Sequence, residues 1–401
     1  MERTPIAVVG GGPAGLATAI ALALAGESVI VLERGRWPRD KICGEGVMPA
    51  GVDVLDRLGV LPLIDADQCR PFQGISWLDK QGKGIDGDFA SGHGLAIRRT
   101  GLSTALYRRA QSLDGIELWQ RAMVQDMVLA PDGVCLTVRH EGQSRTVKAA
   151  VVIGADGRNS RIRKWSGLQG QPPVSVRRWG ARQHFCTQPW SDRVEVWWAD
   201  GVEAYITPSS ESRVEVAFLW DEAVFEPPEK GAKLVTSMLS LFPALRDRLA
   251  GSLDAPTSAA AAMGPLAVAA SGASSDRVLL VGDAVGYVDG ITGEGITAGL
   301  LQAEAVARLL PERLAEERLD ERSLRRLGGA VEAIFQETVP LAQAALLLSR
   351  YSGLRRMVIR GLSRAEGLFT HLLELNMGRT RWYRVSPLTI LEFVGGLLFP
   401  R

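Results

Sequence analysis

Cysteine, histidine and lysine are scarce in this chain of 401 residues. There are four cysteines and four histidines, and 39 of the 46 basic residues are arginine. The cysteines lie far apart and form no CxxC pair, so the sequence indicates neither a zinc site nor a disulfide framework. No metal site is therefore expected, and a reducing cytoplasm is the expected location.

Net charge and long apolar runs are also lacking. The balance of 46 basic against 45 acidic residues leaves a formal charge of +1, so no strong field attracts nucleic acid. No run approaches the roughly 18–20 uninterrupted apolar residues that span a bilayer. The closest, Pro387 to Pro400, is too short and contains Glu392. A soluble or surface-attached protein with no nucleic-acid partner is expected.

The first 33 residues have the pattern of a parallel strand–helix–strand unit. A short apolar run at 5–9 precedes a glycine-rich turn, a small apolar helix reaches residue 25, and a second apolar strand follows at 28–33. A chain of this length favours more than one domain. Alternating strand patterns fill much of residues 74–97 and 123–219. Further helices are predicted over residues 100–112, 231–249 and 293–310.

The turn fits the GxGxxG dinucleotide fingerprint. Gly10 permits the tight turn, Gly12 lets the backbone approach a pyrophosphate, and Gly15 lets the helix pack closely on the strand. Glu33 ends the next strand, where a carboxylate accepts hydrogen bonds from a ribose. The fingerprint alone does not separate NAD from FAD. The candidate ligands in this segment are Gly10, Gly12, Pro13, Ala14, Gly15, Glu33 and Arg34.

Later motifs separate the two cofactors by resemblance. Residues 154–160 (GADGRNS), followed by Arg163, lie at the end of a strand, and Gly282-Asp283-Ala284 ends another before the segment 292–296 (TGEGI). With Arg99-Thr100-Gly101-Leu102, these motifs resemble the p-hydroxybenzoate hydroxylase superfamily of FAD enzymes. The segment 41–46 (KICGEG) is similar to the geranylgeranyl reductase-like branch.

The resemblance implies a fold, a cofactor and site residues. The fold class is α/β: a Rossmann-like, glutathione-reductase-type FAD-binding domain with an inserted antiparallel β-rich substrate domain and a helical C-terminal region. NAD(P)H is expected as a transient reductant, because the sequence has no second GxGxxG unit. The implied FAD contacts are Cys43, Gly44, Arg99, Val124, Asp156, Asp283, Gly293, Gly295 and Ile296.

The motif order implies a discontinuous FAD-binding domain. Its three parts are expected at residues 1–73, 98–169 and 271–310. Substrate-domain strands are expected at 74–97, the main substrate-binding domain at 170–270, and the helical region at 311–401.

The reaction is less sharply indicated than the cofactor. The Tyr-x-Trp-x-Phe-Pro segment of geranylgeranyl reductases keeps only Tyr205 and Pro208 here, which favours hydroxylation of a lipophilic aromatic or polyketide-like substrate. The His and Pro that hydroxylases carry after Gly-Asp-Ala-Ala are missing, so reduction of a C=C bond in an isoprenoid or lipid is the alternative. A non-catalytic flavin-binding protein is the alternative of another class. Cys43 is the candidate catalytic residue as a proton donor, or else a small buried side chain. His184 is more typical of a structural group.

Apolar residues recur at helical spacing from Leu354 to Leu373, with arginines on the other faces. A basic amphipathic helix lies on a membrane surface or walls a lipophilic tunnel, whereas an ordinary packed helix has a similar pattern. Peripheral membrane contact is therefore one expectation for the tail, and the oligomeric state stays open.

Overall fold

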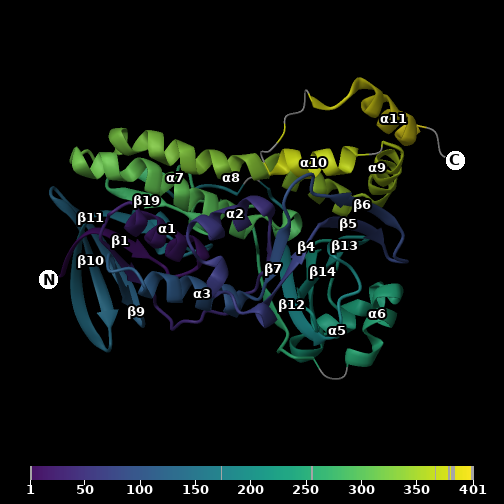
Figure 1. The fold of residues 1–401 in the computed structure, drawn as a ribbon, viewed down its shortest axis with the longest axis horizontal. Helices are drawn as coiled ribbons and strands as arrows, with labels where there is room; N and C mark the ends of the chain where they lie inside the picture. Colours follow the sequence, from purple (N-terminus) through teal and green to yellow (C-terminus); the bar gives the residue numbers. More distant parts are fainter. Residues whose placement is uncertain are drawn as a thin grey trace.

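The computed structural model describes residues 2–172, 174–253, 256–365, 367–377, 380 and 384–398. Two large sheets lie side by side, and long helices run across one side of both (Figure 1). The first sheet has the strand order β18-β19-β11-β1-β2-β8, and the second has the order β16-β12-β15-β14-β13-β5-β6.

The first sheet gathers strands from three distant parts of the chain. Strands β19, β11, β1, β2 and β8 run parallel to one another. All four side chains of β2 are buried, as expected for a parallel sheet covered on both faces. The parallel strands are β1 (Glu2–Val9), β2 (Val29–Leu32), β8 (Ile116–Trp119), β11 (Gln143–Gly154) and β19 (Val278–Leu280), and β18 (Ser274–Ser275) pairs antiparallel with β19.

Helices and an antiparallel extension complete this sheet. The first helix follows the glycine turn as predicted and packs against the two other helices of the sheet. Within the predicted strand region 123–219, two strands extend this sheet: β10 pairs antiparallel with β11, and β9 pairs antiparallel with β10. These elements are α1 (Pro13–Leu24), α3 (Arg99–Gln111), α7 (Gly295–Ala315), β9 (Ala122–Ala130) and β10 (Gly133–His140).

The second sheet is antiparallel except where β13 runs parallel to β5. A separate apolar core, which includes Trp197, Phe218 and Phe242, lies under the short helices α5 and α6. The strands are β5 (Gly74–Asp79), β6 (Gly84–Asp88), β12 (Arg178–Cys186), β13 (Arg193–Ala199), β14 (Val202–Ser210), β15 (Arg213–Asp221) and β16 (Ala261–Met263).

Two expectations for this region differ from the structure. The continuous helix predicted over 231–249 is wrong: α5 (Leu234–Met238) and α6 (Pro243–Leu249) are separate. Pro243 starts α6 because its ring suits the first helical position and cannot continue a preceding helix. The range 74–97 supplies β5 and β6, but β7 (Gly94–Ile97) pairs instead with β3 (Gly46–Val47) and β4 (Cys69–Phe72).

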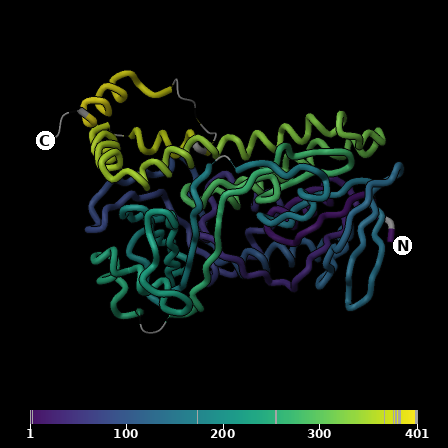
Figure 2. Tube along the Cα trace, turned by 180° about the vertical axis from the view of Figure 1, so that it is seen from behind, coloured from purple at the N-terminus to yellow at the C-terminus, as the bar shows by residue number. Residues whose placement is uncertain are grey.

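The C-terminal helices run along both sheets, and the view from behind shows the same arrangement (Figure 2). The amphipathic stripe predicted from Leu354 to Leu373 is divided, because α9 ends at Arg364 and Gly367 precedes α10 with a positive φ of 79°. Within the described ranges, α8 is the one helix long and apolar enough to cross a membrane, yet its Val331 and Phe335 are buried in the protein core. The helices are α8 (Glu321–Arg350), α9 (Ser352–Arg364), α10 (Leu368–Asn376) and α11 (Pro387–Leu398).

Candidate functional site

A cavity of about 420 Å³ lies between the two sheets. It opens at the carboxyl ends of β1, β2 and β19, the edge at which parallel α/β sheets bind their ligands. All predicted site residues except Gly15 line it. From the first sheet and its loops these are Gly10, Gly12, Pro13, Ala14, Glu33, Arg34, Cys43, Gly44, Arg99, Val124, Asp156, Asp283, Gly293, Gly295 and Ile296.

The glycine turn is built around close backbone approach. Gly10 has a φ of 107°, and a Cβ on Gly15 would lie 1.9 Å from the carbonyl oxygen of Gly10. Gly15 therefore shapes the turn from behind and does not face the cavity. Gly12 is the N-cap of α1 and supplies no capping side chain, so the first N–H groups of the helix are available to an anion.

Arg99 adds a cation to this end of the cavity. Its guanidinium lies close to Gly12, with Nη2 3.9 Å from the position of a Cβ on that residue. Its Nε is buried and has no hydrogen-bond partner among the described residues. A buried guanidinium with a donor left over, beside the start of a helix, fits the phosphates of a dinucleotide.

Glu33 directly follows β2 and is tied to the glycine turn by hydrogen bonds. Its Oε2 accepts a hydrogen bond from the Gly11 N–H at 2.8 Å, and its Oε1 accepts from the Gly35 N–H at 2.6 Å. Arg39 lies 3.5 Å away as an ion-pair partner. Each carboxylate oxygen can accept a second hydrogen bond, so the side chain remains suited to ribose hydroxyls.

Asp283 occupies the turn after β19. Its Oδ2 accepts a hydrogen bond from Lys41 Nζ at 2.7 Å. Burial raises the pKa of Asp283, but the charge and hydrogen bond of Lys41, together with the charges of Arg99 and Arg158, lower it by more, so the carboxyl is ionised near neutral pH. An ionised acceptor at this position suits a polyhydroxyl chain.

Asp156 and Arg163 make the main side-chain hydrogen bonds in and just after the segment 154–160 (GADGRNS). Asp156 Oδ2 accepts from the backbone N–H of Arg161 at 2.7 Å, whereas its Oδ1 is buried without a partner in the described ranges. Arg163 is fully buried and donates to the carbonyl oxygens of Ala284 at 3.0 Å and Arg158 at 2.7 Å. Arg163 therefore joins the two later motifs, and Asp156 combines helix capping with an acceptor at the cavity wall.

The second sheet supplies the opposite wall of the cavity. Tyr205 donates from its hydroxyl to the carbonyl oxygen of Ile291 at 3.1 Å, which ties β14 to the loop before α7. Burial raises the pKa of Tyr205 well above its ordinary value, so the phenol stays neutral. Phe218, Leu219 and Leu266 make this wall largely apolar.

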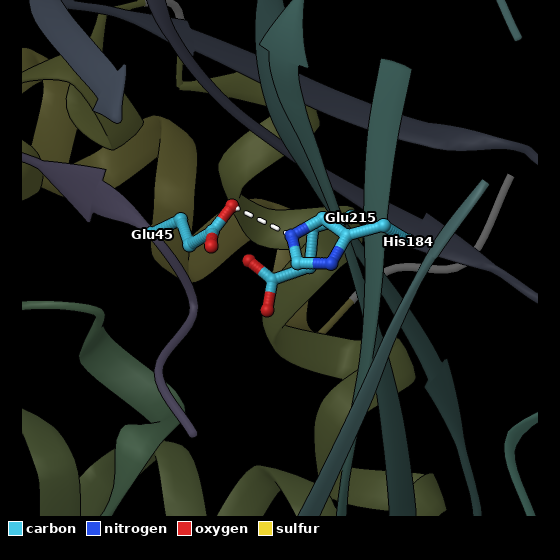
Figure 3. Close-up of side chains that lie close together, drawn as sticks. All are labelled: Glu45, His184 and Glu215. Atoms are coloured by element: carbon cyan, nitrogen blue, oxygen red, sulfur yellow. Dashed lines mark hydrogen bonds and ion pairs between the residues drawn. The ribbon is translucent and has the colours of Figure 1, made fainter. Parts of the chain in front are cut away.

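Cys43 and Glu45 lie where the two walls meet. Cys43 Sγ accepts a hydrogen bond from the Glu45 N–H at 3.2 Å, and burial raises the pKa of the thiol. Glu45 is almost fully buried and meets His184 and Glu215 of the second sheet (Figure 3). Sequence reasoning treated His184 as structural and did not consider Glu215. Alternation marks both as inward-facing, because each lies two residues from a cavity-lining residue, Arg182 or Ala217.

A family model described as FAD binding domain matches residues 3–327. The chain belongs to this FAD-binding family. The cavity fits the cofactor: it has helix N–H groups and Arg99 at a phosphate end, and Glu33 and Asp283 as hydroxyl acceptors. The protein is an FAD-dependent oxidoreductase of the p-hydroxybenzoate hydroxylase superfamily, as the motifs predicted. The assignment of individual residues to FAD contacts stays a prediction.

Relatives in this family carry out different reactions. The chain is 28% identical to a menaquinone reductase of Mycolicibacterium smegmatis over 77% of this chain and 76% of that protein. It is also 28% identical to 6-methylpretetramide 4-monooxygenase of Streptomyces rimosus, over 80% and 78%. The solved flavoprotein/dehydrogenase from Cytophaga hutchinsonii superposes with a TM-score of 0.82 at 19% identity, covering 98% of this chain and 100% of that chain. This likeness confirms the predicted fold class.

Proposed function

We propose that the protein reduces a carbon–carbon double bond in a lipophilic substrate of isoprenoid or quinone type, with NAD(P)H as the electron donor. The observation that carries this proposal is the Cys43 thiol, whose raised pKa keeps its proton, at the wall where the two sheets meet. FAD, when bound, supplies a hydride. Saturating a double bond consumes one proton as well, and this must come from the protein where water is excluded.

The chain's residues support such a proton donor. The raised pKa keeps the hydrogen on Cys43 near neutral pH, and the Glu45 N–H orients its sulfur. The apolar side chains of Phe218, Leu219 and Leu266 accommodate a lipophilic substrate and limit water near the thiol. Proton delivery to the substrate carbon then depends on the position of the thiol.

Hydroxylation of an aromatic or polyketide-like substrate is the second candidate. The similarity to 6-methylpretetramide 4-monooxygenase favours it, and the same apolar wall suits its substrate class. Hydride addition to a double bond leaves a carbon that needs a proton, which a protonated thiol at this wall can supply. Cys43 therefore supports reduction as the first candidate.

Substrate turnover under controlled oxygen separates the two candidates. Purified holoprotein is incubated with NADPH or NADH and a set of polyprenyl quinones, isoprenoids and polyketide aromatics. The molecular masses of the products are then measured by mass spectrometry. A product that gains two hydrogens without oxygen supports reduction, and one that gains an oxygen atom supports hydroxylation. Cys43→Ala should abolish most reduction, whereas Cys135→Ala, on β10 outside the cavity lining, is the matched control.

Peripheral contact with a membrane is part of this proposal. Leu388 and Leu391 of α11 expose 65% and 68% of their surface, and the neighbouring α9 presents Arg356 to solvent. Apolar side chains beside cations suit the interface of an anionic bilayer, where a lipophilic substrate resides. A cytoplasmic protein that visits the membrane surface would meet such a substrate directly.

A further inference from the structure

Three polar residues form a row across the second sheet, next to the cavity wall. His184 of β12 pairs directly with Glu215 of β15, and Glu215 pairs with Thr207 of β14. The adjoining row on the same face contains Arg182 and Ala217, which line the cavity. Because alternate residues of a strand share a face, the row points the same way as that wall, and its Thr207 lines the cavity itself.

Glu45 joins this row from the loop that also carries Cys43. Its Oε2 accepts from Ser209 Oγ at 3.1 Å and lies 2.9 Å from His184 Nε2, and its Oε1 accepts from the Arg99 N–H at 2.9 Å. One ligand atom each of Glu45, His184 and Glu215 lies within 4.8 Å of the others (Figure 3). These contacts hold the buried carboxyl group of Glu45 in place.

The hydrogen bonds define which nitrogen of His184 carries the hydrogen. Arg182 Nη1, which can only donate, lies 3.1 Å from Nδ1. Ser258 Oγ accepts from the His184 backbone N–H, so its own hydrogen is directed at Nδ1, 3.0 Å away. Nδ1 is thus an acceptor, and the hydrogen lies on Nε2 and is donated to Glu45. His184 thereby orients the carboxyl group of Glu45.

Glu215 is the unusual member of the cluster. Its side chain is fully buried, and neither carboxyl oxygen has a hydrogen-bond partner within the described chain. The nearest cation is Arg182, whose Nε is 3.8 Å from Oε1 and whose Nη2 is engaged by Asp40. An ionised carboxyl without hydrogen bonds beside a second buried carboxylate is strongly unfavourable.

The charged and titratable groups that face Glu215 also disfavour its ionised form on balance. Burial raises the pKa of Glu215 well above its ordinary value, Glu45, Cys43 and Asp40 add to the increase, and Arg182 opposes it. A divalent cation would have to bind His184 Nε2, but this nitrogen carries a hydrogen here. Arg182 would also repel the cation. The cluster is therefore built to hold a proton in place of a metal ion.

We propose that Glu215 stores the proton used in the neighbouring cavity, that Glu45 carries it to the cavity wall, and that His184 is the positioning residue for Glu45. This inference rests on the proposed double-bond reduction. FAD reduced by NAD(P)H would supply the hydride for one carbon, and the other carbon takes the proton of Cys43 as the S–H bond breaks. The Glu215 O–H bond then breaks, the proton passes through Glu45 to the thiolate, and solvent later reprotonates the Glu215 carboxylate.

Infrared spectroscopy of the oxidised holoprotein tests the store without turnover. We expect a carbonyl band from a buried protonated carboxyl at neutral pH, which shifts on incorporation of isotopically labelled glutamate and is lost in Glu215→Gln. Glu211→Gln is the control, because Glu211 lies on the exposed turn between β14 and β15, and this variant should keep the band. The labelled wild-type protein provides the test even if Glu215→Gln fails to fold.

Turnover provides the second measurement. Glu215→Gln should lose on the order of a hundredfold in the rate of double-bond reduction while its FAD content and its bleaching by NAD(P)H stay unchanged. Absence of the labelled band overturns the proposal, as does its persistence in Glu215→Gln. A stoichiometric divalent metal that Glu215→Gln loses overturns it in favour of a metal site. If the band is present but the product gains oxygen, the proposed reduction fails and the proton store stands.

Discussion

Lys41 Nζ lies 2.7 Å from Asp283 Oδ2 and joins the loop after β2 to the turn after β19. The two residues are 242 positions apart in the chain. The same loop carries Cys43 and Glu45, and the same turn precedes the glycine-rich segment 292–296 before α7. The pair therefore joins two loops that both line the cavity.

Asp283→Asn should weaken FAD binding about tenfold. A hydrogen bond to a charged group contributes about 1.5–3 kcal/mol. The variant loses the negative charge of the Asp283 carboxylate, which Lys41 helps to keep ionised. The dissociation constant is measured by flavin fluorescence on the apoprotein. Asp276→Asn, exposed beside β19, is the control and should bind FAD like the wild type. Equal affinities for Asp283→Asn and wild type would remove Asp283 from the cofactor site.

Two adjacent glycines of α8 should respond in opposite directions to alanine. A Cβ on Gly328 would lie 2.2 Å from Ser274 Oγ, whereas a Cβ on Gly329 meets nothing within 4 Å. Gly329→Ala should raise the free energy of unfolding by about 1 kcal/mol through helix propensity. Gly328→Ala should lower it by about 1–3 kcal/mol through overpacking. Denaturant unfolding of both variants checks this, and equal shifts would contradict the packing of α8 on β18.

The cofactor side of the cavity was largely predictable from the sequence. Gly10, Gly15 and Glu33 lie within one short strand–turn–helix unit, where local geometry dictates their spacing. Asp156 and Asp283 each follow a strand of the same parallel sheet, so their convergence follows from the fold. The broken helix at 231–249 was missed because the apolar period continues across Phe242 and Pro243.

The substrate side was not predictable in the same way. His184 and Glu215 become neighbours only through the register of β12 and β15, which is determined by packing over the whole sheet. Glu45 reaches them from a loop of the other domain with a positive φ of 54°, a conformation that a Glu residue rarely adopts. A sequence pattern can mark these side chains as inward-facing, but it contains no sign of their partners.

Asp289 should make folding stability depend on pH. It lies in a buried cluster with Arg178 and Glu203, and burial together with Glu203 raises its pKa to about 6 although Arg178 opposes the increase. Its pKa in the native state exceeds its value of about 4 in the unfolded state. Asp289 therefore contributes fully to the free energy of unfolding below about pH 4, and this contribution is lost as the pH rises to about 6. The loss amounts to about 3 kcal/mol. The free energy of unfolding, measured at several pH values, should fall less steeply with rising pH in Asp289→Asn than in the wild type. Parallel curves for the two proteins would contradict the role given to Asp289.

Membrane contact through α11 is tested with lipid vesicles. Leu388→Ser combined with Leu391→Ser removes the two most exposed apolar side chains of the helix. Flotation with anionic vesicles should recover the wild-type protein and lose most of the double variant, because each leucine contributes about 1.5–3 kcal/mol when fully buried. Val128→Ser combined with Leu129→Ser, exposed on β9, is the control and should float like the wild type. Equal recovery of all three proteins would exclude α11 as the contact.

Cys43 should react with alkylating reagents only at high pH. The thiolate is the reactive form, and burial, opposed by Arg99, raises the pKa of this thiol above its ordinary value. Iodoacetamide labelling across a pH series, followed by mass spectrometry of peptides, gives the rate for each cysteine. Cys186 is exposed and serves as the internal reference. Labelling of Cys43 should rise at a pH above about 8.5, the value for a free thiol, and should slow when FAD is added to the apoprotein. If Cys43 labels at neutral pH as fast as Cys186, the thiol does not hold its proton and cannot serve as the donor.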